Sequence, residues 1–534
     1  MSIRNRFVLM AVVAAMGVLA GCSSTNKAAP PPTGGFSDTN LSGTYVFSTA
    51  GTDSNPTTPG FLTMVGTFTA CGCAGGTIST GVVDMNDPNF TAPVKHLAIT
   101  GGSYSVGVDG RGKATLSAAT PFGNTIVLDF VLSSTQGGLV TEFDNNGSGS
   151  GTLDLQSAVT PLTGTYVFNL AGISGVSVTT GFGIPEATVG SVTLTAGTGT
   201  GVQDLNNNGA YSGLSITSNV LVAASPGTAT LGALSFDVYP ISTTHLKLIE
   251  TDTLPILVGD VFAQTTASLP SFPTGQLAFT MAGLDYPAGP VPLAVGGMMA
   301  VNATGTAISS GVEDYNDGGA SNITSTSTVP SAFRGAVTAG GTGRFLLALN
   351  TFENGANGAL GTFTFAAYPS SGGTQLLEID GLGITGGAAY PQVNTSFTSG
   401  QGYGLNLTGS NTTSEEDDIA EFTNTNGKLT GLIDVNDQGA TSTPQNFNAT
   451  YTADSTNLGR GLITSSSYNL ASYTVDSTNT IFIEFDVDQV AIGSIEQQAS
   501  QSQGAIAMRM AALRPRALPR GAWKKKPAAV GQGQ

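Results

Sequence analysis

The stretch Gly81-Val-Val-Asp84-Met-Asn86-Asp87 opens a motif that occurs four times in this chain, each time with the same spacing of glycine, aspartate and asparagine. The other copies are Gly201-Val-Gln-Asp204-Leu-Asn206-Asn207, Gly311-Val-Glu-Asp314-Tyr-Asn316-Asp317 and Gly431-Leu-Ile-Asp434-Val-Asn436-Asp437. We call this motif the DxN phrase. Self-similarity at a regular distance is the sequence signature of repeated structural units. The phrase therefore predicts four homologous units in tandem.

Two further motifs recur at matching positions around the DxN phrase. Each unit opens with an apolar, strand-like run such as Gly43-Thr-Tyr45-Val-Phe47, and closes with a Glu-x-Asp pair and a glutamine twelve residues after the Asp. The pairs are Glu142/Asp144, Glu250/Asp252, Glu378/Asp380 and Glu484/Asp486, and the glutamines are Gln156, Gln264, Gln392 and Gln498. The motifs place the four β repeats at residues 41–158, 162–268, 273–394 and 399–499.

Alternating, β-rich runs bounded by Gly, Asn or Asp are the dominant local pattern, and no comparable window shows a helical period. In the first unit these runs fall at 43–51, 60–70, 76–84, 95–108, 112–119, 124–134, 138–144 and 151–157. We therefore predict an all-β protein of four tandem antiparallel domains with about eight strands each. An up-and-down barrel of lipocalin or avidin size is favoured because closure removes exposed strand edges. A β sandwich is the alternative, and two propeller blades per unit are a third arrangement.

The first 21 residues are typical of a lipoprotein signal peptide. Two arginines precede an apolar run that is too short to span a bilayer and that ends in Leu19-Ala20-Gly21-Cys22. This ending resembles a bacterial lipobox, and the resemblance implies cleavage before Cys22 and its acylation. Because Ser23 follows instead of Asp, the resemblance implies the outer membrane. An ordinary secretory signal with a chance cysteine is the alternative, and residues 22–40 are predicted to be a linker.

Charge divides the chain into an acidic middle and basic ends. Ten of the 18 basic residues lie in the leader, the linker and the tail, whereas no Asp or Glu precedes Asp38 or follows Glu496. The acidic repeats are therefore expected to repel nucleic acid. The tail 500–534 carries the only Trp beside three lysines, and we interpret it as a disordered extension. Docking on an anionic polymer of the envelope is the alternative.

The motif order GTYxF, GxxDxND, DGRG and ExD resembles that of uncharacterised tandem-repeat lipoproteins and secreted proteins of bacteria. The resemblance covers nearly all of residues 41–499. It implies a repeat architecture and a location in the cell envelope. That family has no established activity, so the resemblance implies nothing about mechanism.

The DxN phrase gathers oxygen-bearing side chains in a turn after a strand, and hard oxygen ligands suit Ca²⁺. The spacing differs from the EF-hand pattern, which needs a distant bidentate Glu. We favour turn capping by Asp and Asn over metal binding, so no cofactor is predicted. The candidate residues are Asp84, Asn86, Asp87, Asp204, Asn206, Asp314, Asn316, Asp317, Asp434, Asn436 and Asp437.

The two acids of each Glu-x-Asp pair lie on one face of a strand because strand side chains alternate. Paired carboxylates suggest a glycosidase, but such neighbours stand side by side, about 7 Å apart, and cannot flank a bond. Arg111, Arg344 and Arg460 follow a glycine at matching positions of units one, three and four, so we predict ion pairs with these acids. Unit two has Pro226-Gly227-Thr228 there. Ligand or metal binding is the alternative.

Signals for catalysis are few. The two histidines, His96 and His245, do not occupy a repeated position, and the chain lacks GxSxG, HExxH and GxxxxGK[ST] motifs. Cys71-Gly-Cys73 can close a disulfide, remain reduced or bind a metal.

These features predict a lipid-anchored protein of the bacterial envelope that acts without catalysis as a binding, adhesion or spacer module. Its partners would be the membrane, through the N-terminal lipid, and an envelope polysaccharide or protein. A small-molecule carrier with ligands inside the barrels and a carbohydrate-active enzyme are the alternatives. A carrier requires unfilled barrel interiors, and an enzyme requires additional acid and base residues in one unit.

Overall fold

The computed structural model of the chain describes residues 35–499, apart from residues 56, 158–161, 178–182, 208, 222–224, 265–270, 287–289, 325–326, 342, 352–360, 394–396, 412–413 and 443. The predicted signal peptide, Cys22, most of the linker and the tail 500–534 lie outside the described residues. Within the described part of the chain, the helical structure is one 3-10 turn, η1 (Asp38–Asn40). No helix there is long and apolar enough to cross a membrane.

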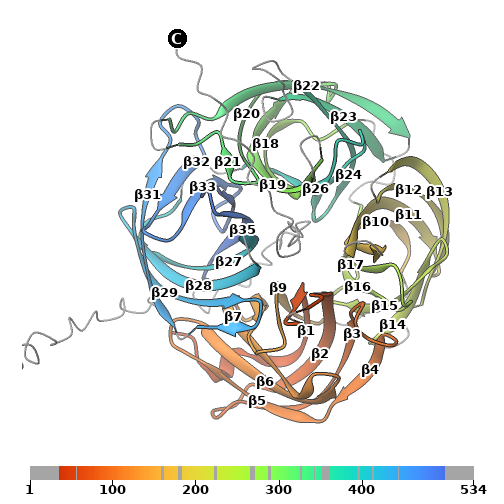
Figure 1. The fold of residues 1–534 in the computed structure, drawn as a ribbon, viewed down its shortest axis with the longest axis vertical. Helices are drawn as coiled ribbons and strands as arrows, with labels where there is room; N and C mark the ends of the chain where they lie inside the picture. Colours follow the sequence, from red (N-terminus) through yellow and green to blue (C-terminus); the bar gives the residue numbers. More distant parts are fainter. Residues whose placement is uncertain are drawn as a thin grey trace, which may run out of the picture. The chain divides into compact units, whose positions relative to one another are not determined.

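Four closed antiparallel β barrels follow one another along the chain, each with eight strands around its circumference (Figure 1). Neighbouring strands pair, and the last strand of each barrel pairs with its first, so that each sheet closes on itself. The predicted up-and-down barrel is confirmed, and the sandwich and propeller-blade alternatives are wrong.

The strand bounds are as follows. Barrel 1 contains β1 (Ser42–Asp53), β2 (Phe61–Cys71), β3 (Thr77–Asn86), β4 (Val94–Ile99), β5 (Gly101–Val106), β6 (Arg111–Thr120), β7 (Gly123–Ser134), β8 (Gly137–Glu142) and β9 (Gly147–Leu155). Barrel 2 contains β10 (Gly164–Val176), β11 (Gly183–Thr195), β12 (Thr198–Asn206), β13 (Ala210–Leu221), β14 (Gly227–Leu231), β15 (Leu234–Pro240), β16 (His245–Glu250) and β17 (Ile256–Ala263). In barrel 1, β4 and β5 share one position, since both pair with β3.

Barrel 3 contains β18 (Gly275–Asp285), β19 (Val291–Val301), β20 (Ala307–Asp317), β21 (Ala320–Ser321), β22 (Ser331–Gly341), β23 (Arg344–Thr351), β24 (Gly361–Ser370), β25 (Gly373–Glu378) and β26 (Gly383–Pro391). Barrel 4 contains β27 (Gln401–Asn411), β28 (Glu415–Thr425), β29 (Lys428–Asp437), β30 (Ala440–Thr441), β31 (Gln445–Ala453), β32 (Arg460–Thr464), β33 (Asn469–Thr474), β34 (Asn479–Glu484) and β35 (Gln489–Gln497). The two-residue strands β21 and β30 pair only with β20 and β29.

The opening motif of each unit supplies the barrel core. In β1, Tyr45 and Phe47 point inward and join Phe68 and Phe130 in one apolar cluster, as strand alternation requires. Equivalent residues of the other units occupy the other barrel cores: Tyr166/Phe168, Leu277/Phe279 and Tyr403/Leu405. The barrels are therefore filled by their own side chains.

A glycine opposite the inward aromatic residue makes room for its ring. Phe47 pairs with Gly66, and a Cβ on Gly66 would lie 2.7 Å from the Cζ of Phe47. The same pairing joins Phe168 to Gly190 and Phe279 to Gly297. In barrel 4 the aromatic residue is replaced by Leu405 and the glycine by Ala420. The two positions therefore vary together, as close packing requires.

Several strands are buried on both faces, so the outer surfaces of the barrels are also covered. In β1 every residue from Tyr45 to Asp53 is buried. A strand of an isolated barrel would expose alternate residues to water. The second buried face of β1 therefore packs against other barrels.

Apolar clusters on these outer faces join each barrel to the next and the fourth barrel to the first. We call the contact regions of barrels 1–2, 2–3, 3–4 and 4–1 the first, second, third and fourth junctions. Their clusters include Val46 with Tyr239, Val189 with Tyr368, Ala294 with Tyr473, and Val131 with Ile419, respectively. The contacts therefore form a closed cycle.

Candidate functional site

The DxN phrase lies at the end of the third strand of each barrel, in β3, β12, β20 and β29. In β3, Val83 and Met85 belong to the barrel core, so alternation turns Asp84 and Asn86 to the outer face. All four first aspartates and all four asparagines are buried. The phrase therefore faces a junction rather than solvent.

At the second junction the first aspartate of the phrase is held by two groups of barrel 3. Arg344 donates from Nε to Oδ2 of Asp204 over 2.7 Å and from Nη2 to Oδ1 over 2.6 Å, and the hydroxyl of Tyr368 donates to Oδ2. Burial by itself raises the pKa of Asp204, but the hydrogen bonds from Arg344 and Tyr368 outweigh it and leave the pKa below its usual value. The carboxylate is thus kept charged although it is buried.

The third junction repeats this arrangement, and the fourth shares the ion pair but has Val131 in place of the tyrosine. Arg460 donates from Nε and Nη2 to Asp314 over 2.6 and 3.0 Å, and Tyr473 donates to the same carboxylate. At the fourth junction, Arg111 of barrel 1 donates to Asp434 of barrel 4. These arginines form ion pairs, but the predicted partner was wrong. Each pairs with the phrase of the preceding barrel in the cycle, not with a Glu-x-Asp pair.

The first junction differs because barrel 2 has no arginine at this place. Tyr239 still donates to Asp84, over 2.7 Å, and the backbone N–H of His96 donates to the other carboxylate oxygen. The imidazole Nε2 of His96 lies 3.0 Å from Oδ2 of Asp237. Burial raises the pKa of Asp84 to about 6, although both hydrogen bonds lower it.

The asparagine of the phrase binds the main chain of the next barrel near its Glu-x-Asp segment. Asn316 donates to the carbonyls of Glu484, Asp486 and Gln489 over 3.1, 2.8 and 2.8 Å. The equivalent acceptors are Glu250 and Asp252 for Asn86, Glu378 and Gly383 for Asn206, and Glu142 and Gly147 for Asn436. The repeated asparagine therefore links neighbouring barrels.

The last residue of the phrase serves its own barrel. Asp87 accepts a hydrogen bond from the backbone of Asn89 over 2.6 Å, and Asp437 accepts one from the hydroxyl of Ser414. Asp317 is buried at the same position. Since the first Asp of the phrase is bound by arginine at three junctions, the four phrases are not equivalent sets of calcium ligands.

In each Glu-x-Asp pair, the Asp accepts hydrogen bonds from backbone N–H groups and the Glu is buried. Asp144 accepts hydrogen bonds from the backbone of Val127 and Asn146 over 3.1 and 2.9 Å, and Asp252, Asp380 and Asp486 each bind backbone N–H groups likewise. All four glutamates are buried. Burial, with the adjacent Asp252, raises the pKa of Glu250 to about 9, and burial raises those of Glu142 and Glu484 well above normal. Glu250 is therefore protonated at neutral pH.

The closing glutamine also reaches the next barrel. Gln392 of barrel 3 donates to the carbonyl of Thr474 in barrel 4 over 2.8 Å. The equivalent bonds join Gln156 to Pro240, Gln264 to Pro369, and Gln498 of barrel 4 to Leu132 of barrel 1. The DxN phrase, the Glu-x-Asp segment and the closing glutamine thus all form hydrogen bonds across every junction.

Cys71 and Cys73, whose state the sequence left open, are joined by a disulfide in the structure. The bond closes the end of β2, where both residues are at the surface. With both sulfurs in the disulfide, they are not thiolate ligands for a metal.

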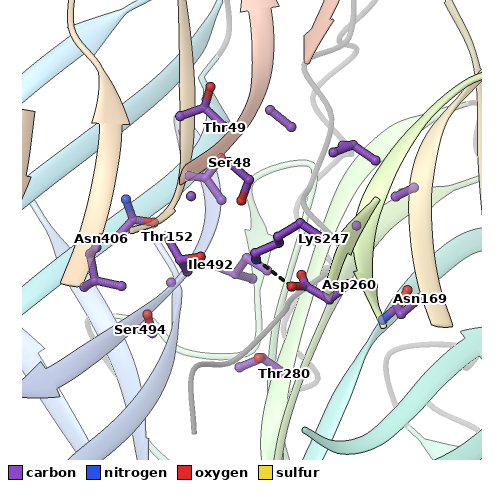
Figure 2. Close-up of a pocket in the computed structure, with 18 of the residues that line it drawn as sticks. Ser48, Thr49, Thr152, Asn169, Lys247, Asp260, Thr280, Asn406, Ile492 and Ser494 are labelled. Atoms are coloured by element: carbon purple, nitrogen blue, oxygen red, sulfur yellow. Dashed lines mark ion pairs between the residues drawn. The ribbon is translucent and has the colours of Figure 1, made fainter. Parts of the chain in front are cut away.

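A cavity of about 120 Å³, measured as space for the centres of water molecules, is lined by polar and apolar residues of all four barrels. Figure 2 shows Lys247 and Asp260 on one side of it and Thr152 and Asn406 on the other. The Nζ of Lys247 lies 2.6 Å from Oδ1 of Asp260. The remaining polar lining includes hydroxyl and amide groups and two carboxyl groups of barrel 4: Ser48, Thr49, Asn169, Thr280, Ser494, Glu415 and Glu496.

Within barrel 2, two basic side chains balance the charge of Asp260. His245 also binds Oδ1 of Asp260, over 2.7 Å. Burial by itself raises the pKa of Asp260, but Lys247 and His245 hold it well below its usual value. This group could not be recognised from the sequence, because its residues are not repeated. The departure of unit two from the repeat pattern was the available signal.

No protein-family model matches the chain, and no curated protein sequence matches it significantly. Its function must therefore be inferred from its own residues and their contacts.

Proposed function

We propose that this protein is a lipid-anchored component of the bacterial cell envelope whose four barrels form one non-enzymatic structural and binding module. The observation that carries the proposal is the use of the repeated polar motifs. The first Asp and the Asn of the phrase, the arginine and the closing glutamine all bind a neighbouring barrel. Because these repeated residues serve contacts between barrels, their repetition does not support four repeated active sites.

The Glu-x-Asp pairs do not favour a carbohydrate-active enzyme. Asp144 is occupied by backbone N–H groups, and Glu142 is buried beside it. A glycosidase needs two carboxyl groups on opposite sides of a bond. The pairs instead suit a structural role.

Ligand binding is assigned to the cavity between the barrels rather than to the barrel interiors. The space among the core side chains of barrel 2 is about 10 Å³, which is at most one water. The cavity between the barrels is larger. Its hydroxyl, amide and carboxyl groups can hydrogen-bond a hydroxyl-rich ligand, and its apolar surface can pack against a sugar ring. We propose a sugar unit of an envelope polysaccharide as that ligand.

Binding is tested by calorimetry with soluble glycan fragments of peptidoglycan and with lipopolysaccharide core oligosaccharide. We expect one of these to bind once per chain, and Thr280→Val, which removes a lining hydroxyl, to weaken binding about tenfold. Thr217→Val, at an exposed position of β13, is the matched control and should bind like the wild type. Absence of binding by both glycans would contradict a polysaccharide ligand.

Anchoring is tested separately by mass spectrometry of the mature N-terminus and by cell fractionation. We expect acyl chains on Cys22 and recovery with the outer membrane. Cys22→Ala should leave the protein in the soluble fraction. A Cys22→Ala protein that still sediments with membranes would contradict lipid anchoring.

A further inference from the structure

The first junction is the only one of the four that lacks an arginine on the buried aspartate of the phrase, among the residues that the structure describes. Barrel 2 has Pro226-Gly227-Thr228 where the other barrels carry Arg111, Arg344 or Arg460. Asp84 is nevertheless buried, with an exposed fraction of 2%. Burying a carboxylate without a cation is unfavourable.

A second carboxylate lies close to Asp84, where an added negative charge makes burial of the Asp84 carboxylate still less favourable. Asp237 stands two residues before Tyr239. The equivalent residues are Ala366 and Ala471 in barrels 3 and 4, and Asp129 in barrel 1, where Lys113 lies 3.3 Å from it. Asp237 is 4% exposed. The first junction therefore has the second acid of the fourth junction but neither of its cations, since Pro226 and Thr228 stand where barrel 1 has Arg111 and Lys113, and this calls for a positive charge between Asp84 and Asp237.

His96 completes the group. Its Nε2 lies 3.0 Å from Asp237, and its backbone N–H is bound to Asp84. One ligand atom each from Asp84, His96 and Asp237 lies within 4.8 Å of the others. His96 also has a φ of +50°, in the left-handed region that a non-glycine residue rarely adopts. The backbone is thus held in an unusual conformation that brings the imidazole to the two acids.

We propose that the first junction binds a Zn²⁺ ion through Asp84, His96 and Asp237, and that this ion takes the place of the guanidinium found at the other junctions. One imidazole and two carboxylates suit Zn²⁺, whereas Ca²⁺ and Mg²⁺ prefer oxygen ligands alone. The two carboxylates balance the charge of the ion. The side chain of His96 is 53% exposed, which gives the ion a route from solvent and leaves a fourth position for water.

The ion would join two barrels, because Asp84 and His96 belong to barrel 1 and Asp237 belongs to β15 of barrel 2. It would act as a structural link, and Tyr239 would keep its hydrogen bond to Asp84. Binding to the folded chain alone raises stability by mass action. The proposal does not depend on the ligand of the cavity or on lipid anchoring.

The test uses untagged full-length protein that has been stripped with a chelator and dialysed against Zn²⁺. We expect one Zn²⁺ per chain by elemental analysis and a melting temperature a few degrees higher than that of the stripped protein. His96→Ala and Asp237→Ala should abolish both effects. Asp237→Ala restores the residue that the second and third junctions carry, so it is expected to fold.

His245→Ala is the matched control, since it removes the other histidine and should keep the bound Zn²⁺. Wild-type protein without bound zinc would overturn the proposal. Full zinc occupancy in His96→Ala and Asp237→Ala would overturn it as well, because the ion would then bind elsewhere.

Discussion

Arg344 and Asp204 are 140 residues apart in the sequence and lie in different barrels, yet they form a two-point ion pair that is buried from solvent. The same relationship joins Arg460 to Asp314. The aspartate of the DxN phrase is therefore one partner of a contact between two neighbouring barrels.

Replacing Arg344 by Met should destabilise the protein by about 3–5 kcal/mol, because it leaves Asp204 buried without its cation. The free energy of unfolding in denaturant, taken from the first cooperative transition, measures this. Arg334→Met is the control, since Arg334 is exposed in β22 and should change stability by less than about 0.5 kcal/mol. Equal effects of the two substitutions would contradict the importance of the buried pair.

Asn316→Asp should be strongly destabilising, because it replaces an amide donor by a carboxylate facing three main-chain carbonyls of barrel 4. We expect a loss of about 2–4 kcal/mol, which a thermal melt would show as a lower melting temperature. Asn145→Asp, the same change at an exposed turn residue, provides the reference. If Asn316→Asp melts like Asn145→Asp, the amide does not join the barrels.

A rise in pH from about 4.5 to about 9 should weaken the fold through Glu250. Its pKa is raised to about 9 in the folded protein, so the folded state keeps a proton that the unfolded chain loses above its ordinary pKa of about 4.5. The stability that this group contributes is complete below that ordinary pKa and is lost as pH rises toward 9, by at most about 1.4 kcal/mol per pH unit.

Glu250→Gln keeps a neutral donor beside Asp252 and should therefore remove this part of the pH dependence. Unfolding measured from pH 5 to pH 9 should give a flatter curve for the variant than for the wild type. Parallel curves would show that Glu250 is ionised in the folded protein.

Gly66→Ala should cost about 1–3 kcal/mol, because the added Cβ meets the ring of Phe47 and the backbone of Val82. Adding Phe47→Leu should recover part of the loss, since barrel 4 combines Leu405 with Ala420. Gly123→Ala has open space around its Cβ and is the control. Purely additive effects of the two changes would contradict the packing relationship.

The barrel architecture could be predicted from the sequence because strand alternation and turn residues are local signals. The run predicted at 60–70 is β2 (Phe61–Cys71), and the run at 124–134 is β7 (Gly123–Ser134). The opening residues Tyr45 and Phe47 point to the barrel interior, as their alternation indicates.

The junctions could not be predicted in the same way. The repeats identified Arg344 and Asp204 as recurring residues. They did not show that the two residues contact each other, because repeat spacing within one sequence does not reveal contacts between units. Tyr368 and Tyr473 follow a Phe or Leu by three residues in their units, and this pattern was the one signal that could have identified the tyrosines. His96 is unique to one junction, and Asp237 has an acidic equivalent only in barrel 1, Asp129, so neither residue gave a fourfold repeat signal.

The closed cycle of contacts is tested most directly by a double-mutant cycle on Arg111 and Asp434, which are 323 residues apart and belong to the first and fourth barrels. The free energies of unfolding of Arg111→Met, Asp434→Asn and the double variant give the coupling between the two side chains. Direct contact at the fourth junction predicts a coupling energy of about 1–3 kcal/mol. Additivity within about 0.5 kcal/mol would contradict the contact between the fourth barrel and the first.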